Sequence, residues 1–412
     1  MADLRVEKLG MINPFVIAAS PATHGVNAIL KSASARPGAV AMRNFRHPRG
    51  GGSLLLPSAK DAAAGKPAAQ THAPGGRLPG DWFSSLDEYE AGIAQARARM
   101  PAEVKLWVSL GAFWETVQFP DWEKDWTDQA RVAERAGADA VELHFNTPGI
   151  AWARNRMFNL PGWITAATRL VKAAVRLPVM VKLPVEAVDP LQVMEAAVHA
   201  GADAIGPTAR WCALHIDLDL KPGATFMGGY SGTQVLPIIC QTIAHARLSG
   251  IQTPMFAGGG VYSWQDAAKL LMAGSECLQL GSIACSLGPR AVRRTIEGLN
   301  RWMDETGHSD MNSLCGKALE SLRDPAKIAE KNECHERLAA ARRQAQPDMA
   351  KCTACGKCAD VCWFDALSVQ DRKPVKTETC IGCGYCFDVC PTGALSVPGG
   401  GSLPVVGRGT KE

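Results

Sequence analysis

The strongest constraint on this chain is a repeated cysteine spacing near its C-terminus. Eight of its fourteen cysteines lie between residues 352 and 390, in two copies of the run C-x2-C-x2-C-x3-C. The two runs are Cys352, Cys355, Cys358, Cys362 and Cys380, Cys383, Cys386, Cys390. Closely spaced thiolates of this kind hold an inorganic group, so this segment is expected to fold around metal rather than around a large apolar core.

We interpret the two runs as ligands of two 4Fe–4S clusters, the pattern of bacterial two-cluster ferredoxins. In that pattern the first three cysteines of a run hold one cluster, and the fourth reaches the other cluster. Pro391 follows the second run, as that pattern requires, whereas Trp363 follows the first. The expected ligand sets are Cys352, Cys355, Cys358 with Cys390, and Cys380, Cys383, Cys386 with Cys362.

Zinc is the alternative, because paired C-x-x-C motifs also build tetrahedral zinc sites. Zinc takes four ligands from two pairs, and its chemistry does not call for a third and a fourth cysteine at these spacings in both copies. The duplicated run therefore favours clusters, which carry single electrons.

The composition is that of an ordinary globular protein, with 47% hydrophobic and 20% charged residues and a net charge of +4. No basic block suggests nucleic acid, no apolar run approaches the roughly 20 residues of a membrane span, and the start has no signal-peptide pattern. The other six cysteines show no pairing pattern, as expected in the reducing cytoplasm. They are Cys212, Cys240, Cys277, Cys285, Cys315 and Cys334.

Residues 15–305 alternate short apolar runs with longer helical patterns, which is typical of repeated βα units. The expected strands are 15–19, 39–43, 105–110, 140–145, 179–183, 204–206, 255–257 and 278–281. The expected helices are 88–100, 127–136, 163–175, 191–200, 233–249 and 264–273. Eight units favour a closed α/β (β/α)8 TIM barrel over an open doubly wound sheet, and no GxGxxG follows the first strand.

The chain is therefore expected to contain a (β/α)8 barrel and a ferredoxin-like 2x4Fe-4S domain. The expected divisions are 1–310 for the barrel, 311–346 for a helical linker, 347–398 for the ferredoxin-like domain and 399–412 for a flexible tail. Residues 46–87, rich in Gly, Pro, Ser and Ala, are expected to form a long loop after the second strand.

The expected cofactor of the barrel follows from glycine-rich stretches near its last strands. Loops after strands seven and eight of a TIM barrel often hold a phosphate on backbone N–H groups. Here they read Gly258-Gly259-Gly260 and Gly281-Ser282, and residues 228–233 are also glycine-rich. A triple glycine alone can be a tight turn. Because one-electron carriers are fused to the barrel, a flavin fits better than a nicotinamide, and FMN is expected.

Several segments carry a family resemblance. FVIAASPAT, GADAVELHFNTPG, LPVMVKL, GGYSGTQVLPI, FAGGGVYS and the eight-cysteine tail resemble dihydropyrimidine dehydrogenases, within the wider dihydroorotate dehydrogenase family. The resemblance covers residues 10–300 and 350–397. It implies FMN at the C-terminal face of the barrel and redox chemistry at a C–C bond beside a carbonyl in a small ring.

The resemblance also implies which residues contact the flavin. Lys182 is expected at the electron-rich edge of the ring, where a cation stabilises reduced flavin; a strand-end lysine in solvent is the alternative. Arg43 stands where the family has a lysine, which keeps the charge but not the shape. The implied FMN contacts are Ala18, Ala19, Arg43, Asn146, Lys182, Gly232, Gly259, Gly260, Gly281 and Ser282.

The catalytic segment departs from the family. Most one-domain members have cysteine, and the membrane-linked class serine, where this chain has Thr147, and His144 replaces a substrate-binding asparagine. Three interpretations remain open. Thr147 acts through water, His144 with its ordinary pKa near 6.5 supplies the proton, or a rim group such as Cys212 has taken over. The alternative for His144 is a structural role or a contact with the flavin. The alternative for Cys212 is a small residue buried in the core.

The substrate is also expected to differ. The family's Asn-Thr pair after strand six is replaced near Thr208-Ala209-Arg210, so donors and acceptors for a pyrimidine edge are lost. We expect a substrate other than uracil or thymine, and Arg210, Arg154 and Arg156 suggest a carboxylate or another anion.

The leading hypothesis is a cytoplasmic FMN and iron–sulfur oxidoreductase that transfers hydride between FMN N5 and a C=C bond conjugated to a carbonyl. The chain has no recognisable NAD(P) or FAD domain, so the external electron donor or acceptor is expected to be a flavoprotein subunit or a ferredoxin. A homo-oligomer or hetero-oligomer is expected, with a small-molecule substrate. The alternatives are a dihydroorotate-type dehydrogenase running oxidatively, and an electron-transfer or scaffold subunit with a degenerate active site.

Overall fold

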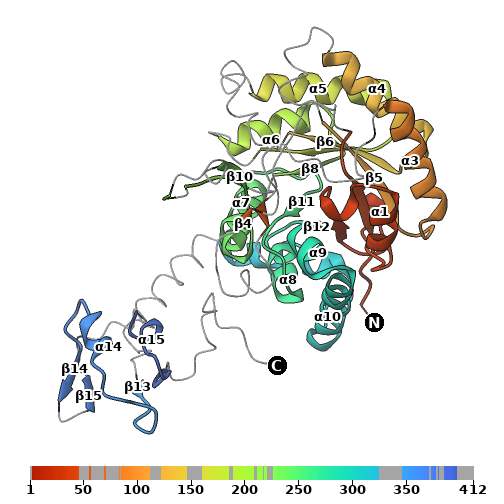
Figure 1. Cartoon of the computed structure of the whole chain (residues 1–412). Coiled ribbons are helices and arrows are strands. Elements are labelled where there is room, and N and C mark those ends of the chain that lie inside the picture. Colours follow the sequence, from red (N-terminus) through yellow and green to blue (C-terminus); the bar gives the residue numbers. More distant parts are fainter. Residues whose placement is uncertain are drawn as a thin grey trace. The chain divides into compact units, whose positions relative to one another are not determined.

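The structure is a computed structural model of the whole chain, drawn in Figure 1. It describes residues 2–45, 55–56, 69–70, 83, 85–111, 122–145, 160–184, 189–207, 211–216, 218–219, 226–323, 346–370, 373–376, 379 and 385–396. The chain divides into two compact units, Met1–Leu319 and Glu320–Glu412.

The first unit is built on a parallel eight-stranded sheet in the order β11-β12-β1-β2-β5-β6-β7-β8. A parallel bridge between Ile205 and Met255 joins β8 to β11 and brings the sheet to closure. All eight strands expected from the apolar runs are present, and the (β/α)8 barrel is confirmed. Their bounds are β1 Phe15–Ile17, β2 Ala39–Met42, β5 Lys105–Leu110, β6 Ala140–His144, β7 Val179–Lys182, β8 Ala204–Gly206, β11 Phe256–Gly258 and β12 Cys277–Leu280.

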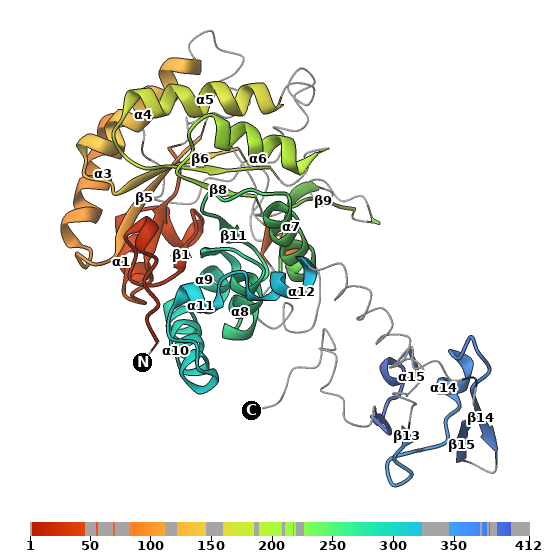
Figure 2. The ribbon, with the colours of Figure 1, turned by 180° about the vertical axis from the view of Figure 1, so that it is seen from behind.

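Helices surround the barrel, as both ribbon views show (Figures 1 and 2). Five of the six expected helices match α3 Leu86–Arg99, α4 Trp122–Arg135, α5 Leu160–Ala174, α6 Pro190–His199 and α8 Trp264–Met272. The sixth is divided into a 3-10 turn, Thr233–Val235, and α7 Leu236–Leu248. Three further helices were not expected: α1 Val26–Ala33, α9 Ser282–Leu287 and α10 Pro289–Thr306. The described residues include no helix long and apolar enough to cross a membrane.

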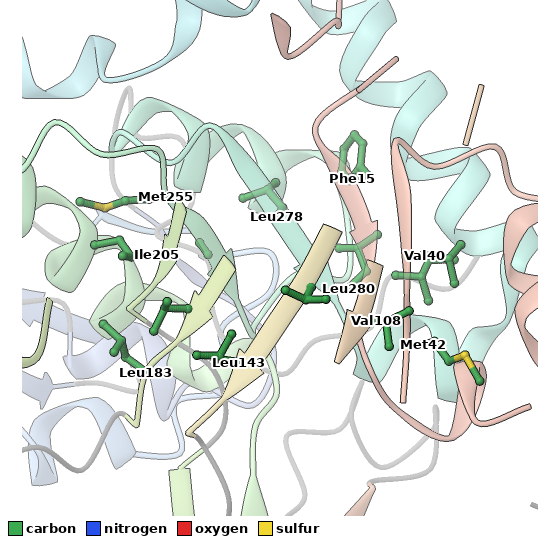
Figure 3. Packing of buried hydrophobic residues seen from close by; sticks show 14 of the residues in the cluster. Phe15, Val40, Met42, Val108, Leu143, Leu183, Ile205, Met255, Leu278 and Leu280 are labelled. Carbon is green, nitrogen blue, oxygen red and sulfur yellow. The ribbon is translucent and has the colours of Figure 1, made fainter. Parts of the chain in front are cut away.

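Side chains alternate between two apolar layers along the barrel strands. The outward side chains pack with helix residues in one large core, shown for Val40, Leu143 and Leu278 in Figure 3. The inward side chains form a second, smaller cluster that includes Trp107 and Phe256, whose rings meet edge to face with centroids 5.8 Å apart. The barrel interior near the N-terminal ends of the strands is thus filled with apolar side chains, as in other TIM barrels.

Two short antiparallel pairs lie outside the barrel sheet. β9 Trp211–His215 pairs with β10 Phe226–Tyr230, which places Gly228 and Gly229 in a strand that was not among the expected ones. β3 Leu55–Leu56 pairs with β4 Ala69–Gln70 within the segment expected to be a loop. Glycines read as a turn signal, so the sequence did not indicate β10.

The first unit continues past residue 310, where a linker was expected. Met311 and Leu314, in the short helix α11 Met311–Leu314, are buried in the outer core of the barrel. Leu319, in a 3-10 turn, is also buried. The short helix α12 Glu320–Arg323 begins the second unit, and residues 324–345 of the expected linker and the tail 399–412 lie outside the described residues.

The second unit contains two small β pairs and two single-turn helices. β13 Gln346–Pro347 pairs with β16 Leu395–Ser396, and β14 Leu367–Gln370 pairs with β15 Lys373–Lys376. The helices are α14 Lys357–Asp360 and α15 Tyr385–Asp388. The small core of this unit consists of Leu367, Cys386, Cys390, Ala394 and Leu395.

One fold prediction concerns Gly38, which precedes β2. A Cβ at Gly38 would lie 2.0 Å from the backbone oxygen of Asn13, whereas one at Gly25 would have no atom within 4 Å. Because the Asn13 side chain binds the Gly38 and Phe15 N–H groups, at 2.8 and 3.1 Å, this backbone cannot shift freely. We expect Gly38→Ala to destabilise the barrel by about 3 kcal/mol, measured by urea unfolding. Gly25→Ala is the matched control, expected to cost less than about 1 kcal/mol; equal stability losses would contradict the packing argument.

Candidate functional site

The candidate flavin site lies at the carboxyl ends of the barrel strands. Ala18, Arg43 and Lys182 stand at the ends of β1, β2 and β7, while Gly259 and Gly281 follow β11 and β12 directly. In parallel barrels these ends share one face, which is where cofactors bind. The structure thus brings these predicted contacts to a common face, although their binding remains a prediction.

A buried polar chain lies above the apolar interior layer. The Lys182 ammonium donates to Gln279 Oε1 at 2.6 Å, and the Gln279 amide donates to Glu142. The Ser109 hydroxyl donates to the other Glu142 oxygen at 3.1 Å. Ser109 and Glu142 are 0% exposed, Gln279 2% and Lys182 6%, so Lys182 is not a solvent lysine. The chain joins β5, β6, β12 and β7 across the barrel.

His144 lies in the same inward series as Glu142, two residues further along β6. It is in register with Lys182 on the neighbouring parallel strand, and the Phe145 N–H donates to the Lys182 carbonyl at 2.9 Å. Equivalent positions on adjacent parallel strands project to the same face of the sheet. His144 and Lys182 therefore share the upper layer of the barrel interior.

The loop after β12 leaves space close to the backbone, and the loop after β11 has glycine conformations. A Cβ on Gly281 would come within 4 Å of only one atom, the Ala18 Cβ at 3.9 Å. Gly259 and Gly260 have φ of 100° and 80°, in the left-handed region that favours glycine. The hydroxyl groups of Ser231 and Ser282 are 2.8 Å apart. The described loops thus offer small residues, hydroxyl groups and backbone N–H groups of the kind that suit a phosphate-bearing ligand.

The residues present fit FMN. Asn44, directly after Arg43, is 8% exposed, and its side-chain nitrogen has no hydrogen-bond partner among the described residues. Such a buried donor is expected to be satisfied by a ligand or water. Gly232, Gly259, Gly260, Gly281 and Ser282 would hold the phosphate end of FMN, while Lys182, Arg43 and Asn44 would face its polar ring atoms.

The catalytic candidates are described only in part. Asn146 and Thr147 lie outside the described residues, as do Arg154, Arg156 and Arg210. The backbone of Cys212 lies in β9, opposite Gly229 of β10, so Cys212 belongs to the hairpin rather than to a barrel strand.

Sequence reasoning missed four polar residues of this face: Asn44, Ser109, Glu142 and Gln279. A signal was available for Glu142 and Gln279, because each interrupts an otherwise apolar strand at an inward position. A charged or amide side chain at such a position must be paired when it is buried.

The second unit brings together the first predicted set of cluster ligands. Cys352, Cys355, Cys358 and Cys390 line one cavity, together with Thr392 and the apolar Ala394 and Leu395. The three cysteines of the first run are thus joined by the last cysteine of the second run, as the crossed ligand pattern requires. No three His, Cys, Asp or Glu side chains in the described residues converge as they would around a single metal ion.

Backbone N–H groups donate to the cysteine sulfurs of this unit. Ala354 donates to Cys352 at 3.4 Å, Ala366 to Cys362 at 3.2 Å and Ala394 to Cys390 at 3.2 Å. Burial raises the pKa of the Cys390 thiol, but hydrogen bonds from Thr392 and neighbouring N–H groups outweigh it, and the net pKa is lowered. Burial raises the pKa of Cys358. Such N–H···S contacts stabilise thiolates and tune the potentials of iron–sulfur clusters.

The second predicted ligand set is described in part. Cys362 and Cys386 pack in the small core of the unit, in the same cluster as Cys390. Cys380 and Cys383 lie outside the described residues. The described cysteines are compatible with a second cluster, whose presence remains a prediction.

Comparisons with known proteins agree with both units. Residues 373–396 match the model of the 4Fe-4S binding domain, a range that contains the second cysteine run. The chain is 31% identical over 194 residues to the catalytic subunit of dihydroorotate dehydrogenase B (NAD(+)) from Pyrococcus abyssi, covering 46% of this chain and 64% of that protein. It is 28% identical over 254 residues to the NAD-dependent dihydropyrimidine dehydrogenase subunit PreA from Escherichia coli K12, covering 58% of this chain and 59% of that protein.

The matched regions span less than two thirds of these relatives' lengths. The model of the dihydroorotate dehydrogenase family matches residues 87–303, which is more than half of the chain and includes β5 to β12 of the barrel. The chain therefore belongs to the dihydroorotate dehydrogenase family.

Proposed function

We propose that this chain is an FMN and iron–sulfur dependent oxidoreductase that acts on a C–C bond beside a carbonyl in a small ring. One observation carries the proposal: a single chain combines a family barrel, with a buried lysine at its strand ends, and a unit whose cysteines line a common cavity. Bound FMN would supply hydride transfer at N5 and would couple this two-electron step to one-electron carriers.

Two 4Fe–4S clusters would exchange these electrons with a partner. The Pyrococcus relative is named as a catalytic subunit and the Escherichia relative as a subunit, so both names imply assemblies. We propose a separate flavoprotein subunit or a ferredoxin as the donor or acceptor. Rapid NADPH oxidation by the purified chain alone would argue against this partner.

We propose His144 as the group that moves the proton. It is half-buried at the end of β6 and projects into the same layer as Lys182. An imidazole is a better proton donor near neutral pH than the hydroxyl of Thr147. Thr147 acting through water and Cys212 remain the alternatives, because their side chains are outside the described residues.

The substrate is proposed to be a small ring with an anionic group. Both relatives are named for dihydropyrimidine-type substrates, dihydroorotate and dihydropyrimidine. The loss of the family's asparagines favours a substrate other than uracil or thymine, and the rim arginines favour a carboxylate. Ordinary rates of uracil reduction would contradict this part of the proposal.

Two other functions follow from the same fold. Oxidation of a dihydroorotate-type substrate would use the same groups in the reverse direction. A scaffold or electron-transfer subunit would explain the absence of a catalytic cysteine at Thr147. Turnover of an unsaturated ring by reduced enzyme would exclude the scaffold.

One prediction of the proposed function concerns cofactor content. We expect about one FMN and about eight iron atoms per chain, measured by acid release of flavin and by iron and sulfide assays after anaerobic purification. Cys355→Ala should lower iron to about four and leave FMN unchanged, because Cys355 is an exposed ligand of one cluster. Cys240→Ala, a half-buried barrel cysteine, is the matched control. About four iron atoms in the unmodified protein would contradict the two-cluster proposal.

Another prediction of the proposed function concerns the effect of His144 on turnover. Replacing it with Gln keeps a polar side chain of similar length but removes the titrating group. We expect kcat to fall by about 10²–10⁴ while FMN content stays unchanged, measured by steady-state turnover of a reduced ring substrate. If Thr147→Ala or Cys212→Ala causes that loss and His144→Gln does not, the proton donor is the other residue.

A further inference from the structure

The polar chain inside the barrel contains one carboxyl group and one ammonium, separated by an amide. Glu142 and Lys182 do not bond each other directly; each bonds one end of the Gln279 amide. All three side chains are buried, with exposures of 0%, 6% and 2% for Glu142, Lys182 and Gln279. Buried charged groups are stabilised by hydrogen bonds, and the Gln279 amide supplies one to Lys182 and one to Glu142.

The orientation of the Gln279 amide follows from its two neighbours. An ammonium can only donate hydrogen bonds, and an ionised carboxylate can only accept them. The amide satisfies both when its oxygen faces Lys182 and its nitrogen faces Glu142, as in the structure. The reverse orientation would place two donors together at Lys182 and two acceptors together at Glu142.

Ser109 completes the chain at its other end. Its hydroxyl donates to the second Glu142 oxygen at 3.1 Å, so both carboxylate oxygens accept a hydrogen bond. This arrangement suits an ionised carboxylate, which has acceptors on both oxygens. Both Glu142 oxygens are thus held in place, two residues before His144, which is in register with Lys182.

We infer that Glu142 is a positioning residue for the flavin site, which acts through Gln279 to hold Lys182 charged and directed toward the bound ring. This inference rests on the proposed function, because Lys182 serves as the flavin-facing cation there. A bound ring would shield Lys182 further from water, so the counter-charge beneath it would matter most in the complex. Glu142 itself does not touch the flavin.

The competing account is that Glu142 only stabilises the barrel. A buried carboxylate with two hydrogen bonds contributes to stability wherever it lies, and its loss would then lower stability without a specific effect on FMN. The two accounts differ in whether the effect of Glu142 depends on Lys182. A double-mutant cycle between these residues measures that dependence directly.

The experiment measures the Kd of FMN for the full chain after removal of its flavin, by the quenching of flavin fluorescence on binding. Glu142→Gln keeps the side-chain size, removes the charge and releases the Gln279 amide from its fixed orientation. We expect FMN binding to weaken about tenfold, which corresponds to about 1.4 kcal/mol. Lys182→Met should weaken binding by at least as much, and adding Glu142→Gln to it should change the Kd by less than about twofold.

Glu276→Gln is the matched control. Glu276 is a half-buried carboxylate at the opposite end of the barrel, just before β12, where it bonds Arg247 at 2.5 Å and the Met255 N–H at 2.7 Å. We expect this variant to lose thermal stability and to keep the Kd of FMN. A Glu142→Gln protein with unchanged Kd, or an effect that persists fully in the Lys182→Met background, would overturn the inference. Failure of the unmodified chain to bind FMN would instead refute the proposed function, and the inference with it.

Discussion

Side chains along the barrel strands alternate between the surrounding helices and the barrel interior, and this alternation determines where the core and the site can form. Each strand is buried on both faces, so its outward residues must match the helices and its inward residues must fill the barrel. Near the N-terminal ends the inward positions are apolar, with Trp107 and Phe256 in edge-to-face contact. Two residues further along each strand, the inward side chains are polar: Ser109, Glu142, Gln279 and Lys182. This change from an apolar to a polar layer separates the supporting part of the barrel from its site.

Most of the fold was predictable because strands of a buried parallel sheet appear as continuous apolar runs. The bounds of two strands, β5 and β8, match the expected ones, and those of the other six differ by one or two residues. The β9–β10 hairpin was missed, since Gly228 and Gly229 indicate a turn locally and only pairing with Ala213 and Cys212 makes them a strand. The contribution of α11 to the barrel was missed because the burial of Leu314 depends on helices distant in sequence.

The site was less predictable than the fold. Lys182 was expected from a resemblance, but its partner Gln279 lies 97 residues away in the chain and on a different strand. The sequence shows that Glu142 interrupts an apolar strand. Its hydrogen-bond partners, Ser109 and Gln279, are seen only in the closed barrel. The crossed pairing of Cys390 with the first cysteine run was predictable, because it follows from a repeated spacing rather than from the packing of the whole unit.

The two units place different demands on their residues. A cluster needs thiolate sulfur at fixed positions, so substitution of one cysteine removes a ligand that no other residue type replaces equally. A proton donor at a strand end needs only a titrating group within reach, and several neighbouring positions can provide it. This difference would explain how a chain could keep the eight cysteines of its two runs while Thr147 and His144 depart from the pattern that the family resemblance implies. The polar layer under the site then limits such changes, because a new donor must fit beside Lys182, whose ammonium already bonds Gln279.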